Sequence, residues 1–273
     1  MSIHVEAGEK AEERFVIELN ADKKDPRWQM LGIKNAEEYF VVRVQYNHYS
    51  KFSEQKVQPK ADVFIASGTV TPQQLKQCKF LLKEDALKDL CLVPVPCTGI
   101  SIKKYDSASY TIHKWPPDSF KKKFVDYELG AGIELFVENH EEFDKNDRVI
   151  SEWKTSWAKI EDYFSSIDNI KVLKDKEADP DVRKKVGKEV KKLSKEKVYG
   201  MIKSNADIID HIFYGSNDFD EPYNATWLFT YGKLERMQSG AAPVPFRIDQ
   251  GSGRTKGKYT VVIKPKIKKV RRK

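Results

Sequence analysis

Glu12, Asp62 and Lys103 have the side-chain types that hydrolysis of a phosphodiester requires. Glu12 lies in a segment with helical periodicity, Asp62 precedes a short apolar run, and Lys103 ends the alternating sequence Ile100-Ser101-Ile102-Lys103. Carboxylates with retained water are the ligands that magnesium prefers beside a scissile phosphate. A lysine next to the ion can assist the attacking water or offset the charge that develops on the phosphate. The sequence therefore predicts a magnesium site formed by Asp62 and Glu12, with Lys103 beside it.

A short amphipathic helix is expected to position Glu12. Ala11, Phe15 and Leu19 recur at every fourth position within residues 8–19, which is the spacing of one helix face. The glutamate-rich start of this segment suits a helix N-terminus. A strand with Phe15, Ile17 and Leu19 on one face is the alternative interpretation.

Strands are expected to position Asp62 and Lys103. Residues 39–46 are rich in β-branched and aromatic side chains, residues 60–66 form a compact apolar run, and residues 99–103 alternate apolar and polar side chains. Between them, Thr71-Pro72 is typical of a helix start, which predicts a helix between residues 71 and 90.

The rest of the chain changes from a helical to a β-like pattern. Residues 119–217 show mainly helical periodicity, whereas residues 225–231 and 258–263 have the composition of strands. The sequence as a whole predicts an α/β fold with a central mixed β-sheet flanked by helices.

The excess positive charge of the chain is concentrated at the C-terminus. The formal net charge is +8, from 49 Lys and Arg against 41 Asp and Glu. Residues 254–273 contain ten Lys or Arg and no acidic residue, so the other 39 basic side chains are slightly outnumbered by the acidic ones. Concentrated basic charge favours binding to phosphates, because each neutralised phosphate releases a counterion. A solvated basic tail is the alternative.

The order of helix glutamate, strand aspartate and a short motif ending in lysine resembles the nuclease superfamily named after its Pro-Asp and Asp/Glu-x-Lys motifs, PD-(D/E)xK, which includes the type II restriction endonucleases. The resemblance covers residues 8–104 by motif and the remainder by general layout. It implies a single nuclease domain over residues 1–273, with a helical middle region (119–217) and a basic, β-rich C-terminal segment (218–273). It also implies Mg²⁺-dependent cleavage of double-stranded DNA at a short sequence, with Asp62 as a metal ligand and Lys103 assisting the attacking water.

The sequence departs from the family pattern at two positions. Pro59 is not adjacent to Asp62, and Ser101 stands where the second acid usually lies, so the motif resembles the Ser-x-Lys variant of the family. Serine is not a strong metal ligand, and another carboxylate must take this role. Glu12 is the first candidate, followed by Asp106 and Asp118.

Two polar segments are candidates for contact with DNA. The first follows Lys103 directly and is rich in hydrogen-bond donors, although it could also be an ordinary polar loop. The second combines glycines with side chains that can recognise bases or phosphates. The predicted DNA-binding residues are Lys104, Ser107, Ser109, His113, Gln250, Ser252, Arg254 and Lys256. A palindromic target would favour a homodimer, while a monomeric mode stays open.

The remaining expectations concern location and rival functions. The sequence has no apolar run of signal-peptide or membrane-spanning length, which favours the cytosol. Cys78, Cys91 and Cys97 lack zinc-site spacing and are expected to be reduced and mostly buried thiols. A non-catalytic DNA- or RNA-binding protein that uses the basic C-terminal segment is one rival, and a structural protein whose tail binds an acidic partner is another.

Overall fold

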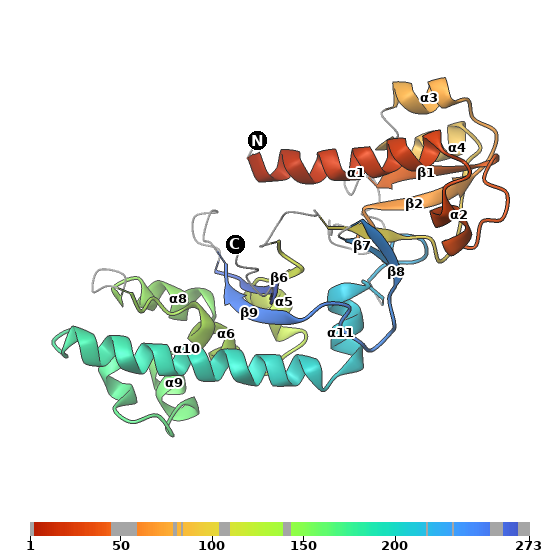
Figure 1. Cartoon of the computed structure of the whole chain (residues 1–273). Helices are drawn as coiled ribbons and strands as arrows, with labels where there is room; N and C mark the ends of the chain where they lie inside the picture. Colours follow the sequence, from red (N-terminus) through yellow and green to blue (C-terminus); the bar gives the residue numbers. More distant parts are fainter. Residues whose placement is uncertain are drawn as a thin grey trace, which may run out of the picture. The chain divides into compact units, whose positions relative to one another are not determined.

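A computed structural model describes residues 3–44, 59–78, 81–82, 84–103, 110–138, 143–216, 218–230, 232–251 and 259–266. The chain forms two compact units (Figure 1). Unit 1 consists of Met1–Ala108 and Ile209–Pro243, and unit 2 consists of Ser109–Ile208 and Val244–Lys273. Compact units need not fold independently, so the single nuclease domain stays a prediction.

Unit 1 is built around a mixed β-sheet, which confirms the α/β class and the mixed sheet. The strands follow the order β3-β1-β2-β5-β7-β8, and β4 pairs with β2 beside this path. The pairs β1–β2, β2–β5 and β7–β8 are antiparallel, whereas β1–β3 and β5–β7 are parallel. The bounds of the strands in this sheet are β1 Tyr39–Val44, β2 Val63–Ser67, β3 Leu81–Leu82, β4 Val93–Pro94, β5 Ile100–Ile102, β7 Trp227–Thr230 and β8 Lys233–Arg236.

Strand β2 lies at the centre of this sheet. Its residues Val63, Phe64, Ile65 and Ala66 are all fully buried, which explains why the apolar run is continuous rather than alternating. Strands β1 and β5 pair with its two edges, so the residues at the start of β2 lie between the neighbouring strands.

The helices of unit 1 confirm one predicted helix and correct another. The predicted helix at residues 8–19 lies within α1 (Ile3–Ala21). The single helix expected between residues 71 and 90 is wrong, because α3 (Pro72–Gln77) and α4 (Glu84–Asp89) are separated by β3. Leu81 and Leu82 instead extend the sheet by pairing with the end of β1. The unit also contains α2 (Pro26–Met30) and the end of α11 (Ala206–Phe213).

Helix α1 is attached to the sheet by apolar packing and by one side chain. Phe15, Val16 and Leu19 are buried in the core shared with β1, β2 and β5. The side-chain amide of Asn20 donates to the carbonyl oxygen of Val41 at 2.8 Å and accepts from its N–H at 2.9 Å. The side chain thus pairs with the backbone of β1, which fixes α1 relative to the sheet.

Unit 2 combines helices with a small antiparallel sheet ordered β6-β10-β9. Helix α10 packs against α6 and β9. The helices agree with the helical middle region expected from the sequence, whereas β6 and β9, like β8 in unit 1, were not expected. The elements are α5 Pro117–Lys121, α6 Tyr127–Glu134, α8 Asn146–Glu152, α9 Trp157–Tyr163, the 3₁₀ helix η3 Ile170–Leu173, α10 Pro180–Lys203, β6 His113–Trp115, β9 Phe246–Gln250 and β10 Val261–Pro265.

Close packing in unit 2 depends on Gly130 in α6. A Cβ atom at this position would lie 2.0 Å from the ring of Trp153, which is fully buried. We expect Gly130→Ala to lower the free energy of unfolding by about 1–3 kcal/mol, because the indole ring must move within a filled core. Denaturant unfolding of the two proteins measures this difference. The exposed Gly200→Ala in α10 is the control, since a Cβ there meets no atom within 4 Å.

Two further expectations concern the cysteines and membrane segments. The three cysteines are free thiols, but Cys78, Cys91 and Cys97 are all exposed, so the expectation of mostly buried thiols is wrong. Cys91 and Cys97 lie in connections between elements with positive φ angles, outside the apolar core. Within the described residues, every helix is too short or too polar to span a membrane.

Candidate functional site

Asp62 lies immediately before β2, at a point where the backbone is fixed from both sides. Its N–H donates to the carbonyl oxygen of Ile100 at 2.8 Å, and its own carbonyl oxygen accepts from the N–H of Val44 at 3.0 Å. The residue is therefore connected to both neighbouring strands. This connection holds the carboxylate in a defined position at the ends of β1 and β5.

Strand β5 surrounds the carboxylate of Asp62 with donors. Its Oδ2 atom accepts from the backbone N–H of Ile102 at 2.6 Å and from the hydroxyl of Ser101 at 3.2 Å. The Nζ atom of Lys103 lies 3.5 Å from the same oxygen.

Helix α1 brings Glu12 to the same place. Glu12 lies one turn before the buried Phe15 and Val16, on the face of α1 that packs on the sheet. Its Oε2 atom accepts from Arg43 of β1 at 3.3 Å, and both side chains are largely shielded from solvent. The predicted trio of Glu12, Asp62 and Lys103 thus lies together in unit 1.

The pKa of Glu12 depends on its burial and on the charged side chains around it. Burial, followed by repulsion from the charge of Asp62, raises the pKa of Glu12 to about 7, although Arg43 and Lys103 act in the opposite direction. A carboxylate that is costly to ionise beside a second carboxylate is typical of sites that bind a cation. A divalent ion between the two would relieve their repulsion.

Lys60 is a member of this neighbourhood that sequence reasoning missed. It precedes Asp62 by two residues, and its stem packs so closely on Gly215 that a Cβ there would lie 2.5 Å from Lys60 Cγ. Burial, followed by repulsion from Lys103, lowers the pKa of Lys60 to about 7, while Asp218 and Asp62 favour its charged form. The apolar run that begins at residue 60 predicted a strand. It gave no indication that Lys60 would interact with the carboxylates of Asp218 and Asp62.

Arg43 is the second residue that the sequence did not indicate. It lies in a strand of apolar and aromatic residues, where an arginine predicts only an exposed charge at the edge of a sheet. Its partner Glu12 is 31 residues away in the chain, and only the packing of α1 on β1 brings the two together. Its guanidinium orients the carboxylate of Glu12.

The residues present fit a magnesium ion. Magnesium is bound by one or two carboxylates together with water and substrate phosphate oxygens, and Asp62 and Glu12 can supply the carboxylates. Within the described ranges, no group of three or more His, Cys, Asp or Glu side chains is placed to hold a metal ion. A two-carboxylate site agrees with Ser101 in place of the usual second acid.

Asp118, another candidate for the missing acid, belongs to unit 2 and forms an exposed ion pair with Lys154 at 2.6 Å. Two predicted DNA-binding residues are also described in that unit. His113 of β6 lies against the ring of Trp115, and the side-chain oxygen of Gln250 accepts from Lys191. The other predicted residues lie outside the described part of the chain, and they are Lys104, Asp106, Ser107, Ser109, Ser252, Arg254 and Lys256.

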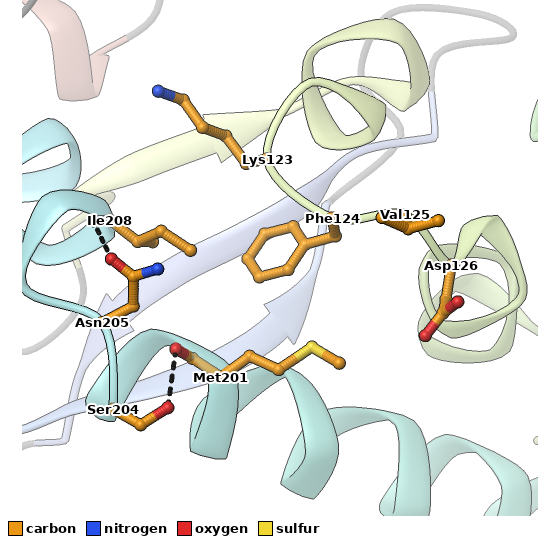
Figure 2. Close-up of a pocket in the computed structure, with 8 residues that line it drawn as sticks. All are labelled: Lys123, Phe124, Val125, Asp126, Met201, Ser204, Asn205 and Ile208. Atoms are coloured by element: carbon orange, nitrogen blue, oxygen red, sulfur yellow. Dashed lines mark hydrogen bonds between the residues drawn. The ribbon is translucent and has the colours of Figure 1, made fainter.

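Unit 2 also contains an open pocket of about 390 Å³ (Figure 2). Two of its polar side chains cap local backbone: Asn205 accepts from the N–H of Ile208 at 3.1 Å, and Ser204 donates to the carbonyl oxygen of Met201 at 3.3 Å. None of the predicted site residues is among the lining residues, which are Lys123, Phe124, Val125, Asp126, Met201, Ser204, Asn205 and Ile208. The pocket is therefore separate from the carboxylate site of unit 1.

Comparison with known proteins gives no match: no family model, no curated protein and no solved structure matches this chain. The functional interpretation therefore depends on the motif and on the geometry of the site.

The raised pKa of Glu12 gives a testable pH dependence. Its pKa is about 7 in the folded protein against an ordinary value of 4.5, so between these values the folded chain holds a proton that the unfolded chain releases. The free energy of unfolding must then fall as the pH rises through this window. Glu12→Gln cannot ionise, and we expect its stability relative to the parent protein to rise by about 1–3 kcal/mol from pH 4.5 to pH 8.

Urea unfolding of both proteins in EDTA at several pH values measures this difference. Glu18→Gln, at an exposed glutamate of the same helix, is the control. A difference between Glu12→Gln and the parent that stays constant with pH would contradict the raised pKa of Glu12.

Proposed function

We propose that this protein is a magnesium-dependent endonuclease that cleaves double-stranded DNA at a specific sequence, as type II restriction enzymes of the PD-(D/E)xK superfamily do. The observation that supports the proposal most is the convergence of Glu12, Asp62, Ser101 and Lys103 from three separate places in the sequence: Ser101 and Lys103 contact the carboxylate of Asp62, and Glu12 interacts with its charge. The restriction-endonuclease-like fold and a cytoplasmic location are parts of the same proposal.

Each residue has a role that follows from its contacts. Asp62 and Glu12 would hold the ion, Arg43 would orient Glu12, and Ser101 would orient Asp62 through its hydroxyl. A bound magnesium ion supplies the Lewis acid that polarises the phosphate. Lys103, within ion-pair distance of Asp62, assists the attacking water and offsets the negative charge that grows in the transition state.

The proposal is tested by incubating the purified full-length chain with plasmid and phage DNA, with and without magnesium or manganese. Discrete fragments that depend on the metal are expected. A homodimer in solution would accord with a palindromic recognition sequence. Absence of cleavage with either metal over a broad range of DNA sequences would overturn the nuclease, and DNA binding without cleavage would favour a non-catalytic DNA-binding protein.

A further inference from the structure

Three cationic side chains of unit 2 share a single carboxylate. Asp249 of β9 lies 3.4 Å from Lys195 Nζ of α10, 3.4 Å from Lys264 Nζ of β10 and 3.6 Å from Arg247 Nη2 of β9. We call these four residues the Asp249 cluster. It is built from three elements that pack together within unit 2.

The strand register extends this cationic face across the small sheet. Lys264 pairs directly with Arg247, and Val262 pairs with both Asp249 and Lys114. Directly paired residues of antiparallel strands point to the same face. The exposed Lys114 therefore lies on the same face of the sheet as the cluster.

The charges of the Asp249 cluster do not balance. Within the described residues, Lys195, Arg247 and Lys264 have no other carboxylate within ion-pair distance, so three positive charges face one negative charge. Glu134, another acidic side chain near Asp249, is buried, and burial raises its pKa to about 8, which leaves it mostly uncharged at pH 7. The neighbouring Lys191 donates to the neutral amide of Gln250.

The cationic groups are accessible to a ligand. The exposed fractions of the side chains are 30% for Lys195, 23% for Lys264 and 54% for Arg247. A structural network of ion pairs would be expected to neutralise its charges, whereas this one keeps an excess that faces solvent. The sequences that follow β9 and β10 are also basic, with three Lys or Arg in residues 252–258 and six in residues 266–273.

We propose that this face of unit 2 binds the phosphate backbone of duplex DNA, independently of base sequence. The inference rests on the proposed function, in that DNA is the partner. Asp249 holds the three cations in place without a ligand, and a phosphate replaces it as their partner when DNA binds. Lysine and arginine contacts to phosphate position a protein on the duplex and leave sequence discrimination to other residues.

The decisive variant is Asp249→Asn, because the two possible roles of the cluster predict opposite results. If the face binds phosphate, removal of the competing carboxylate should tighten binding by about three- to tenfold. If the cluster only stabilises the fold, the variant should lose stability with no gain in affinity. The measurement is fluorescence anisotropy with a 25-base-pair duplex of arbitrary sequence in EDTA, over a series of salt concentrations.

A second variant provides an independent measurement. Lys195→Met combined with Lys264→Met should weaken binding by roughly tenfold or more and reduce the slope of log affinity against log salt by about two. Lys197→Met is the matched control and should leave the slope nearly unchanged, because Lys197 is exposed and lies two residues after Lys195, on the opposite face of α10. Circular dichroism establishes that each variant is folded.

The outcomes separate this inference from the nuclease. The proposal of a phosphate-binding surface would be overturned if the folded variants show no change in DNA affinity or salt slope, or if all the variants unfold. It would also be overturned if the variants lose binding to poly-glutamate as much as binding to DNA. Asp62→Asn should retain both the affinity and the salt slope. If the expected changes in affinity and salt slope occur but no metal-dependent cleavage is ever seen, the phosphate-binding surface is supported and the nuclease proposal is overturned.

Discussion

Replacement of Asp62 by asparagine should lower the rate of DNA cleavage by at least about a thousandfold, which corresponds to roughly 4 kcal/mol of transition-state stabilisation. Asparagine keeps the shape of the side chain and an oxygen that can accept from the N–H of Ile102. It lacks the negative charge that a magnesium ligand requires at this position. The loss should therefore appear in catalysis, while the fold of unit 1 is retained.

The measurement is the single-turnover rate on a cleavable plasmid, together with duplex binding in EDTA. Binding should stay within about twofold of the parent protein, since phosphate contacts supply most of the affinity. Asp22→Asn is the matched control: its exposed side chain accepts from the N–H of Lys24 after α1, away from the carboxylate pair. Equal activity of Asp62→Asn and the parent would exclude Asp62 as a metal ligand.

The same variant has a second consequence that does not depend on catalysis. Repulsion from Asp62 is the second largest cause of the raised pKa of Glu12, after burial. Removal of that charge should lower the pKa of Glu12 from about 7. Side-chain NMR or the pH dependence of stability can measure this shift in a protein that does not cleave DNA.

The strands that carry the candidate site could be predicted from local pattern because their composition is distinctive. The continuous apolar run of β2 is what burial on both faces of the sheet requires. The alternation of β5 predicted a strand, although Ser101 is buried together with Ile100 and Ile102. The pairing of these two strands, which brings Asp62 to Ser101 and Lys103, connects residues about 40 positions apart. No local pattern encodes that pairing, and only the order of motifs suggested it.

Other parts of the fold gave weaker signals. Strand β3 consists of two leucines, and it forms because the edge of β1 is available to pair with it. Strand β6 is three residues long and follows a polar stretch, so its pairing with β10 depends on tertiary contacts. Lys60 and Arg43 were missed for a related reason: a lysine and an arginine next to apolar runs resemble ordinary edge charges until the fold brings carboxylates to them.

Lys103→Met should reduce the cleavage rate by about a hundred- to a thousandfold, which is the usual effect of removing one preorganised charge from a transition state. Methionine preserves the apolar stem of the side chain, and the backbone N–H of residue 103 still donates to the carbonyl oxygen of Phe229. The ammonium group near Asp62 is the only group lost. Because this charge acts on the transition state, kcat should fall while KM changes little.

Arginine at position 103 distinguishes the two chemical roles that remain open for Lys103. A guanidinium keeps its positive charge and does not give up a proton under these conditions, so it can stabilise charge but cannot accept a proton from the attacking water. Restoration of most of the activity by Lys103→Arg would assign an electrostatic role, whereas activity as low as in Lys103→Met would assign a role in proton transfer. Lys233→Met, in the exposed strand β8 of the same sheet, should cleave DNA at the parent rate. A Lys103→Met protein that also cleaves at the parent rate would remove Lys103 from the catalytic site.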